Sequence, residues 1–168
     1  MKHLKKSSLL AFLMILAMFF AVSCDVAQEE DNTENEPSEF IDVPDNLIGT
    51  WEFNGQWTES YTITKDTFSS AGSYAGDSAK VYKTDDKSGY IYIKYTKAAN
   101  ADWTYSETAP DVGKWYAIHY KDLTDSTLKL SGAYKADGKT ATATIEEAKA
   151  EFTVDNGYFA FYSELEKK

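Results

Sequence analysis

The sequence contains one cysteine, no arginine and only two histidines in 168 residues. Residues 47–168 hold one histidine, His119, and no cysteine, which excludes disulfides and zinc sites with two or more His or Cys ligands there. A glycine-rich phosphate loop, an EF-hand loop and an H-E-x-x-H motif are also absent. Seventeen lysines against 27 acids give a net charge of −10, which does not suit a nucleic-acid backbone. We therefore predict no metal, no cofactor and no nucleic-acid partner.

Long apolar runs are scarce as well, and the longest one lies near the start. Residues 9–22 are all apolar, follow a segment with three lysines and precede the only cysteine, Cys24. A membrane-spanning helix needs about 20 apolar residues, so these 14 are too short for a permanent span. A positive start, a short apolar centre and small residues at its end are typical of a secretory signal peptide. We predict that residues 1–23 are such a signal.

The end of this run, Ala21-Val22-Ser23-Cys24, resembles the lipobox of bacterial lipoproteins. In that family the cysteine sulfur is joined to diacylglycerol, the signal is removed and the new amino terminus receives a fatty acid such as palmitate. The family prefers Leu or another branched residue where this chain has Ala21. The resemblance implies lipidation at Cys24 and attachment to the outer membrane, on its surface or its periplasmic face. An ordinary cleaved signal and an uncleaved anchor are the alternatives.

Residues 24–46 differ sharply from what precedes them. The stretch 25–45 contains nine acids, two prolines and no lysine. Such a segment cannot bury enough apolar surface to offset the cost of ordering, so we predict a disordered acidic tether. A plain spacer is the favoured interpretation. Asp25 with Glu29, Glu30 and Asp31 is also similar to acidic signals that direct lipoproteins of some diderm bacteria to the cell surface.

Residues 47–168 have the length of one small domain and the punctuation of an all-β chain. Turn pairs such as Asn54-Gly55 separate short runs rich in Tyr, Trp, Thr, Ile and Val. We predict about eight antiparallel strands, which would form a closed up-and-down β-barrel or, alternatively, a two-sheet sandwich. The predicted strands are residues 47–53, 57–64, 67–70, 79–84, 89–97, 115–121 and 127–134, and a last hairpin of 152–154 with 158–163. A capping box from Thr144 to Glu147 predicts one short helix.

Gly49-Thr50-Trp51 on the first predicted strand looks like the G-x-W motif of lipocalins and their calycin relatives. In those families the tryptophan packs across one end of the barrel, the glycine lets the chain bend, and a basic residue, normally Arg, covers the ring. This chain has no arginine, and the sequence assigns no lysine to that role. The helical turn followed by a last strand is loosely similar too. The resemblance implies a lipocalin-like barrel.

The strands 89–97 and 115–121 are apolar on both faces, which indicates that one face lines the barrel and the other is covered. The interior of an eight-stranded barrel holds side chains or one small ligand. Glu59 interrupts an apolar face, and if buried it needs a partner such as a tyrosine hydroxyl or a lysine. Residues 98–114, a short strand or a mobile cover, are expected to control access. The predicted lining residues are Trp51, Trp57, Tyr61, Tyr92, Trp115 and His119.

We therefore expect a membrane-anchored lipoprotein whose barrel binds a small apolar or amphipathic molecule. The alternative is a surface interaction protein with a filled barrel and no small ligand, which meets another protein through its outer aromatics. An enzyme that uses His119 is the least favoured class, because no nucleophile motif accompanies this histidine. We predict no catalytic activity, and we expect His119 to be a hydrogen-bonded residue of the barrel wall.

Overall fold

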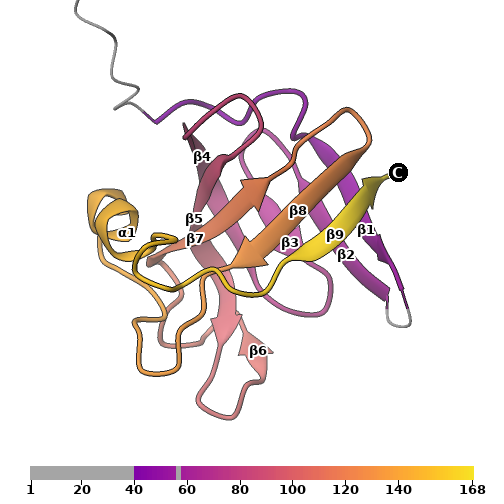
Figure 1. The fold of residues 1–168 in the computed structure, drawn as a ribbon. Coiled ribbons are helices and arrows are strands. Elements are labelled where there is room, and N and C mark those ends of the chain that lie inside the picture. The colour runs from indigo at the N-terminus through magenta and orange to yellow at the C-terminus, as the bar shows by residue number, and fades with distance from the viewer. Residues whose placement is uncertain (1–39, 56–57) are drawn as a thin grey trace, which may run out of the picture. The chain divides into compact units, whose positions relative to one another are not determined.

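The computed structural model describes residues 40–55 and 58–168. The described residues all belong to one compact unit. Within it, eight strands form a closed antiparallel barrel (Figure 1). These strands are β1 (Gly49–Asn54), β2 (Thr58–Ile63), β3 (Phe68–Ser70), β4 (Ala75–Lys83), β5 (Gly89–Ala99), β7 (Trp115–Lys121), β8 (Thr127–Gly132) and β9 (Ser163–Lys167). The short strand β6 (Tyr105–Ser106) pairs with the end of β5, and α1 spans Ile145–Glu151.

Strands that follow one another in sequence are neighbours in the barrel. The order runs from β4 through β3, β2, β1, β9, β8 and β7 to β5, and pairing of β4 with β5 closes the ring. This arrangement confirms the predicted barrel and sets the sandwich aside. Closure leaves no open sheet edge, and the core lies inside the unit, so we expect residues 35–168 to fold independently.

The period of two along each strand decides which side chains fill the barrel. Trp51 lies opposite Tyr61 in the β1–β2 ladder, and Ile91 opposite Ile118 in the β5–β7 ladder. All four side chains are buried and face the interior. The odd-numbered residues from Gly89 to Tyr95 and the even-numbered residues from Tyr116 to Tyr120 therefore line the barrel.

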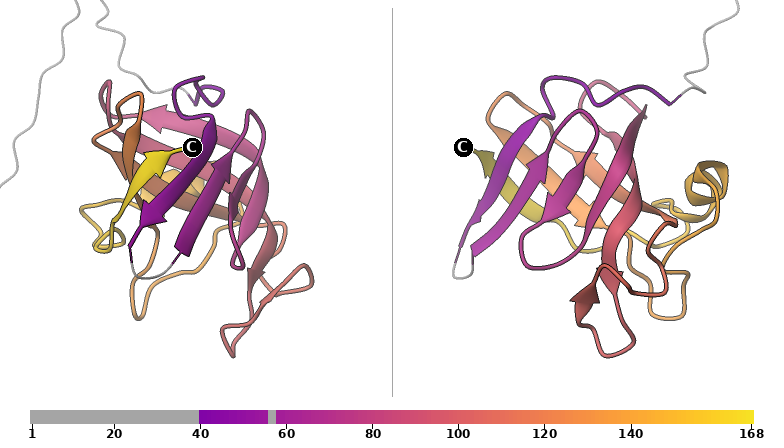
Figure 2. Two further views of the ribbon diagram at one scale, coloured as in Figure 1. Left: turned by 90° about the vertical axis from the view of Figure 1, so that its right-hand side faces the viewer. Right: turned by 180° about the vertical axis from the view of Figure 1, so that it is seen from behind.

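The outer face of β5 and β7 is covered, as its apolar residues indicated. α1 lies outside the barrel beside β7, and the right-hand view of Figure 2 shows it from behind. The helix begins at the predicted capping box: the Thr144 hydroxyl accepts from the Glu147 backbone N–H, and the Glu147 carboxylate accepts from the Thr144 backbone N–H. Phe40 packs on Tyr92, with ring centroids 5.4 Å apart. No helix in the described part of the chain is both long and apolar enough to cross a bilayer.

The predicted last hairpin is wrong. Phe152 caps α1 instead of starting a strand, and residues 158–162 cross the outer face of the barrel without strand structure. The side-chain amide of Asn156 donates to the carbonyls of Ala150 and Glu151, so the Asp-Asn-Gly turn closes the helix rather than a hairpin. The last strand, β9, begins only at Ser163 and pairs with β1 and β8.

The barrel also recruits residues that the sequence analysis assigned to the tether. Ile41 forms an antiparallel bridge with Val81, on a part of β4 that β3 does not pair with. Asp42 forms an ion pair with Lys80, and Val43 is buried. The folded part therefore includes residues 40–46, which the Ile41 bridge, the Asp42 ion pair and the burial of Val43 hold against the barrel.

Candidate functional site

The two ends of the barrel differ in how they are filled. At the end where β1 begins, Trp51 is fully buried and its indole N–H donates to the Leu47 carbonyl over 2.9 Å. The Lys167 ammonium lies 5.1 Å from the centre of the Trp51 indole ring. A lysine thus lies over this ring. Gly49 has a φ of +149°, and a side-chain carbon there would lie 2.6 Å from Lys167 Cε. This end is sealed.

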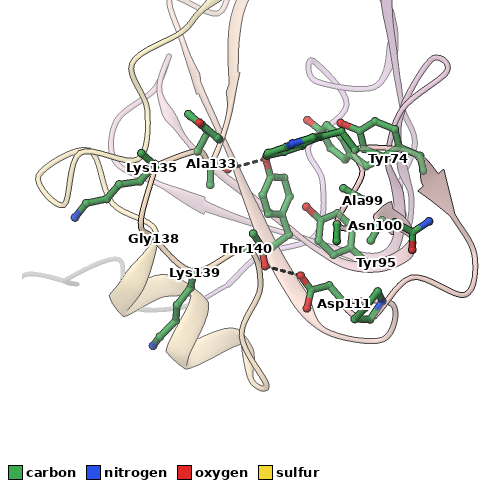
Figure 3. Close-up of a pocket in the computed structure, with 18 residues that line it drawn as sticks. Tyr74, Tyr95, Ala99, Asn100, Asp111, Ala133, Lys135, Gly138, Lys139 and Thr140 are labelled. Atoms are coloured by element: carbon green, nitrogen blue, oxygen red, sulfur yellow. Dashed lines mark hydrogen bonds between the residues drawn. The ribbon is translucent and has the colours of Figure 1, made fainter.

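The opposite end, near β6, contains a cavity of about 670 Å³ (Figure 3). Its wall combines β5 and β7 with the β5–β6 hairpin and the segment that follows β8. Small alanines make room for it, and six aromatic side chains line it: Tyr74, Tyr95, Trp103, Tyr105, Tyr116 and Tyr134. A cavity of this size and composition is typical of a small-molecule site.

Three tyrosines that pack on one another form the deep wall. The rings of Tyr95 and Tyr116 are stacked with centroids 4.8 Å apart, and Tyr74 meets Tyr116 edge to face at 5.3 Å. The Tyr116 hydroxyl donates to the Ala133 carbonyl over 3.0 Å. Burial raises the pKa of all three hydroxyls well above that of an exposed tyrosine. They therefore stay protonated and neutral at any physiological pH.

Gly132 makes space for these hydroxyls. A side-chain carbon at this position would lie 2.6 Å from Tyr116 Oη and 3.1 Å from Tyr74 Oη. Any larger residue would displace one or both hydroxyls. The deep end of the cavity is therefore polar but uncharged, and its shape depends on a glycine.

Charged groups around the cavity are mostly paired. Asp111 accepts from Lys114 Nζ over 2.8 Å and from the Thr140 hydroxyl over 2.5 Å. Burial acts to raise the pKa of the Asp111 carboxyl, but these two donors outweigh it and the pKa is lowered. Lys139 forms a 3.0 Å ion pair with Glu151. The Asp111 contacts also tie the segment after β6 to the segment after β8.

Glu59 lies inside the barrel beside Tyr61, as its position in the apolar pattern suggested. Its carboxylate accepts from the Tyr61 hydroxyl and, over 2.7 Å, from the Ser163 hydroxyl. The expected partner of this half-buried acid is thus a tyrosine, with a serine added. Burial and the hydrogen bond to Glu59 together raise the pKa of Tyr61.

Of the six residues predicted to line a ligand site, the five that the structure describes do not come together. Trp51 lies at the sealed end, and Tyr61 lies inside the barrel. Trp57 lies outside the described residues. Tyr92, Trp115 and His119 lie on the outer face, because their β5–β7 pairing alternates with the inward residues. The sequence of a strand that is apolar on both faces does not reveal which face points inward. For this reason Tyr92, Trp115 and His119 were predicted to face the interior, although they face outward.

His119 occupies a buried aromatic site under the segment that precedes β9. Its Nδ1 lies 3.0 Å from the Tyr162 hydroxyl, and its ring centroid lies 4.7 Å from that of Tyr90. Burial, helped by the nearby Lys121, lowers the pKa of His119 to about 4. The residue is therefore a hydrogen-bonded part of the barrel wall. The described residues contain no group of three or more His, Cys, Asp or Glu side chains placed to hold a metal ion.

The cavity residues that sequence reasoning missed are Tyr74, Tyr95, Tyr105, Tyr116, Trp103 and Tyr134. The sequence contained a signal for Tyr95, because it lies on the same face of β5 as Ile91 and Ile93. Trp103 and Tyr105 belong to the segment 98–114 that was expected to control access, and its short-strand alternative is confirmed by β6.

Comparisons with protein-family models, with curated proteins and with solved structures find no match to this chain.

Proposed function

We propose that this chain is a lipid-anchored envelope protein whose barrel binds a small apolar or amphipathic molecule at the end near β6. The observation that carries the ligand proposal is the aromatic-lined cavity of about 670 Å³. The opposite end of the barrel is packed, so a ligand has only this end of the described barrel to enter by. The proposed lipid anchor at Cys24 rests on the lipobox alone.

Native mass spectrometry of the full mature chain, extracted from its own envelope, tests the ligand proposal. We expect an additional mass that leaves on denaturation. A chain that repeatedly carries only its covalent lipid would contradict the proposal.

The anchor has a separate test. Cys24→Ser removes the sulfur that would carry diacylglycerol, so the protein should move from the detergent phase to the aqueous phase on partitioning. Ser23→Ala is the matched control, because it keeps a small residue before the cysteine and should leave partitioning unchanged. If Cys24→Ser still partitions with detergent as a processed chain, the anchor proposal fails.

A surface interaction protein is the second candidate, and one observation favours it. Trp103, Tyr134 and Phe161 are 65%, 50% and 74% exposed, and Tyr134 lies between the other two with ring centroids 6.5 Å apart on each side. Exposed aromatic groups of this kind are common in protein interfaces. Cross-linking in whole cells through a photoreactive residue at position 161 would capture such a partner. Capture of one defined protein, together with no ligand mass, would favour this candidate.

A further inference from the structure

Three exposed aromatic residues border the mouth of the cavity. Trp103, Tyr134 and Phe161 form an aromatic row, in which the ring centroids of neighbours lie 6.5 Å apart. Each residue is at least half exposed. Trp103 and Tyr134 also line the cavity, whereas Phe161 does not. The aromatic row therefore extends an apolar surface from the mouth onto the outside of the barrel.

Trp103 is held at the tip of a projecting hairpin. It lies in the turn between β5 and β6, and Figure 1 shows this hairpin extending beyond the rest of the barrel. Its φ of +63° is unusual for a bulky residue. The turn is fixed by Asp102, which accepts from the Thr104 backbone N–H over 3.1 Å and from its hydroxyl over 2.6 Å, and the Trp103 N–H donates to the Asn100 carbonyl. A strained turn persists where such contacts fix it, and paired polar groups lower the cost of approaching hydrocarbon.

The residues that precede the described barrel are numerous enough to bring this end of it to a membrane. The 16 residues 24–39 separate the proposed lipid site from the first described residue. Fully extended, they span at most about 55 Å. The longest described strand, β5, has 11 residues and a length of about 36 Å. The reach of the tether exceeds the length of the barrel wall, so a barrel anchored at Cys24 can turn its β6 end towards the bilayer.

The charges of the barrel favour a bilayer that has no net charge. Residues 47–168 carry 18 acids and 14 lysines, a net charge of −4, which opposes binding to anionic lipid. Lys135 follows Tyr134 and lines the cavity, and none of the ion pairs among the described residues involves it. A lysine beside an apolar surface can bury its stem while its ammonium stays at the level of the lipid head groups. A zwitterionic lipid offers Lys135 a phosphate without adding a net charge that opposes the acids.

The position of the aromatic row at the mouth favours a bilayer over a protein partner. Trp and Tyr are enriched at membrane–water interfaces, because their rings combine an apolar body with a polar tip. A small apolar ligand prefers the bilayer to water. A mouth that contacts the bilayer lets such a ligand enter the cavity without crossing water, whereas a protein bound over Trp103 and Tyr134 would cover the same mouth.

We propose that the aromatic row docks the β6 end of the barrel on a zwitterionic lipid bilayer, so that the ligand passes directly between the bilayer and the cavity. This inference rests on the proposed function and adds the surface from which the ligand is taken. In the docked state Trp103, Tyr134 and Phe161 lie at the depth of the lipid head groups, and Lys135 contacts lipid phosphate.

Vesicles of phosphatidylcholine test the docking with residues 35–168, because the lipid anchor alone would hold the full mature chain on any vesicle. The emission of Trp103, isolated by difference from the Trp103→Phe variant, should shift to shorter wavelength and be quenched by phosphatidylcholine with brominated acyl chains. Adding the anionic lipid phosphatidylglycerol should not strengthen binding. An unchanged Trp103 emission, or binding only when phosphatidylglycerol is present, would overturn the proposal.

A pair of variants locates the contact. Phe161→Ser removes an exposed ring from the aromatic row and should lower the vesicle partition coefficient about tenfold in sedimentation. Val154→Ser is the matched control, because Val154 is 45% exposed and lies outside the aromatic row, and it should partition like the wild type. Equal partitioning of the two variants would contradict the assignment.

Binding of 1-octanol, measured by calorimetry without vesicles, reports on the cavity alone. Phe161→Ser should leave the affinity for octanol unchanged, since Phe161 does not line the cavity. Octanol binding without vesicle binding would overturn the docking and leave the proposed function in place. Absence of octanol binding would instead count against the proposed function itself. Cross-linking of position 161 to one defined protein, with no vesicle binding, would overturn the docking in favour of a protein partner.

Discussion

His119 should make the stability of the barrel depend on pH in a way that can be calculated. The side chain is 7% exposed, contacts Tyr90 and Phe159, and hydrogen-bonds Tyr162. Burial lowers its pKa from 6.5 to about 4; Lys121 adds to the shift, and Asp85 opposes it weakly. In the unfolded chain the pKa returns to about 6.5. Between these two values the unfolded chain binds a proton that the folded protein does not.

This difference in pKa sets the direction in which stability changes with pH. The full stability is present above the unfolded pKa, and it is lost as the pH falls from about 6.5 towards 4. Each unit of difference is worth about 1.4 kcal/mol, so lowering the pH from about 7.5 to 4.5 should remove about 2 to 2.5 kcal/mol from the free energy of unfolding. With a urea slope of about 1.5 kcal/mol per M, the midpoint should fall by roughly 1.3 to 1.7 M.

Urea unfolding of residues 35–168 and of the His119→Gln variant at both pH values isolates this contribution. Carboxyl groups also titrate in this range, but their effect is common to both proteins and cancels in the difference. We expect the variant to lose much less stability than the wild type between the two pH values. Parallel pH profiles for the two proteins would refute the argument that His119 is buried in its neutral form.

Three further substitutions have defined outcomes. Gly132→Ala should lower the free energy of unfolding by about 1 to 3 kcal/mol in urea titrations, because the new methyl would lie 2.6 Å from Tyr116 Oη, and it should abolish octanol binding. Trp103→Ala should weaken octanol binding about fivefold in calorimetry and change stability by less than about 0.5 kcal/mol, since the ring is exposed. Thr144→Ala should cost about 1 kcal/mol in the same urea assay, because it removes the cap of α1. Unchanged stability in the first and last variants, or unchanged affinity in the second, would contradict these expectations.

The barrel was predictable because its signals are local. Alternation along β2, the Asn54-Gly55 turn and the Thr144–Glu147 capping box each depend on residues that are close in sequence. The same reasoning predicted that a buried Glu59 needs a partner such as a tyrosine or a lysine, and Tyr61, two residues away, is that partner. Period-two patterns and a cap motif therefore sufficed for the barrel class and for the helix α1, though not for the last hairpin.

The site was not predictable, because it depends on contacts distant in sequence. β5 and β7 are apolar on both faces, so the sequence did not show that Tyr95 and Tyr116 face inward and that Tyr92 and His119 face outward. That distinction requires the strand pairing around the whole barrel. The cavity also exists because Gly132, on a different strand, leaves space beside the tyrosine hydroxyls. The prediction of the last hairpin was wrong for a related reason. The Asn156 side chain in the turn after α1 donates hydrogen bonds to carbonyls of the helix, and a period-two pattern does not reveal such a contact.

The indole N–H signals of the tryptophans test the central claim most directly, because Trp51 lies at the sealed end and Trp103 at the cavity mouth. A ¹H–¹⁵N spectrum of residues 35–168, assigned by substitution and titrated with 1-octanol, reports on both ends at once. Binding at the proposed site predicts that the Trp103 signal moves and saturates while the Trp51 signal stays in place. A Trp103 signal that does not move, or a Trp51 signal that moves in its place, would contradict the claim that this barrel binds a small ligand at its β6 end.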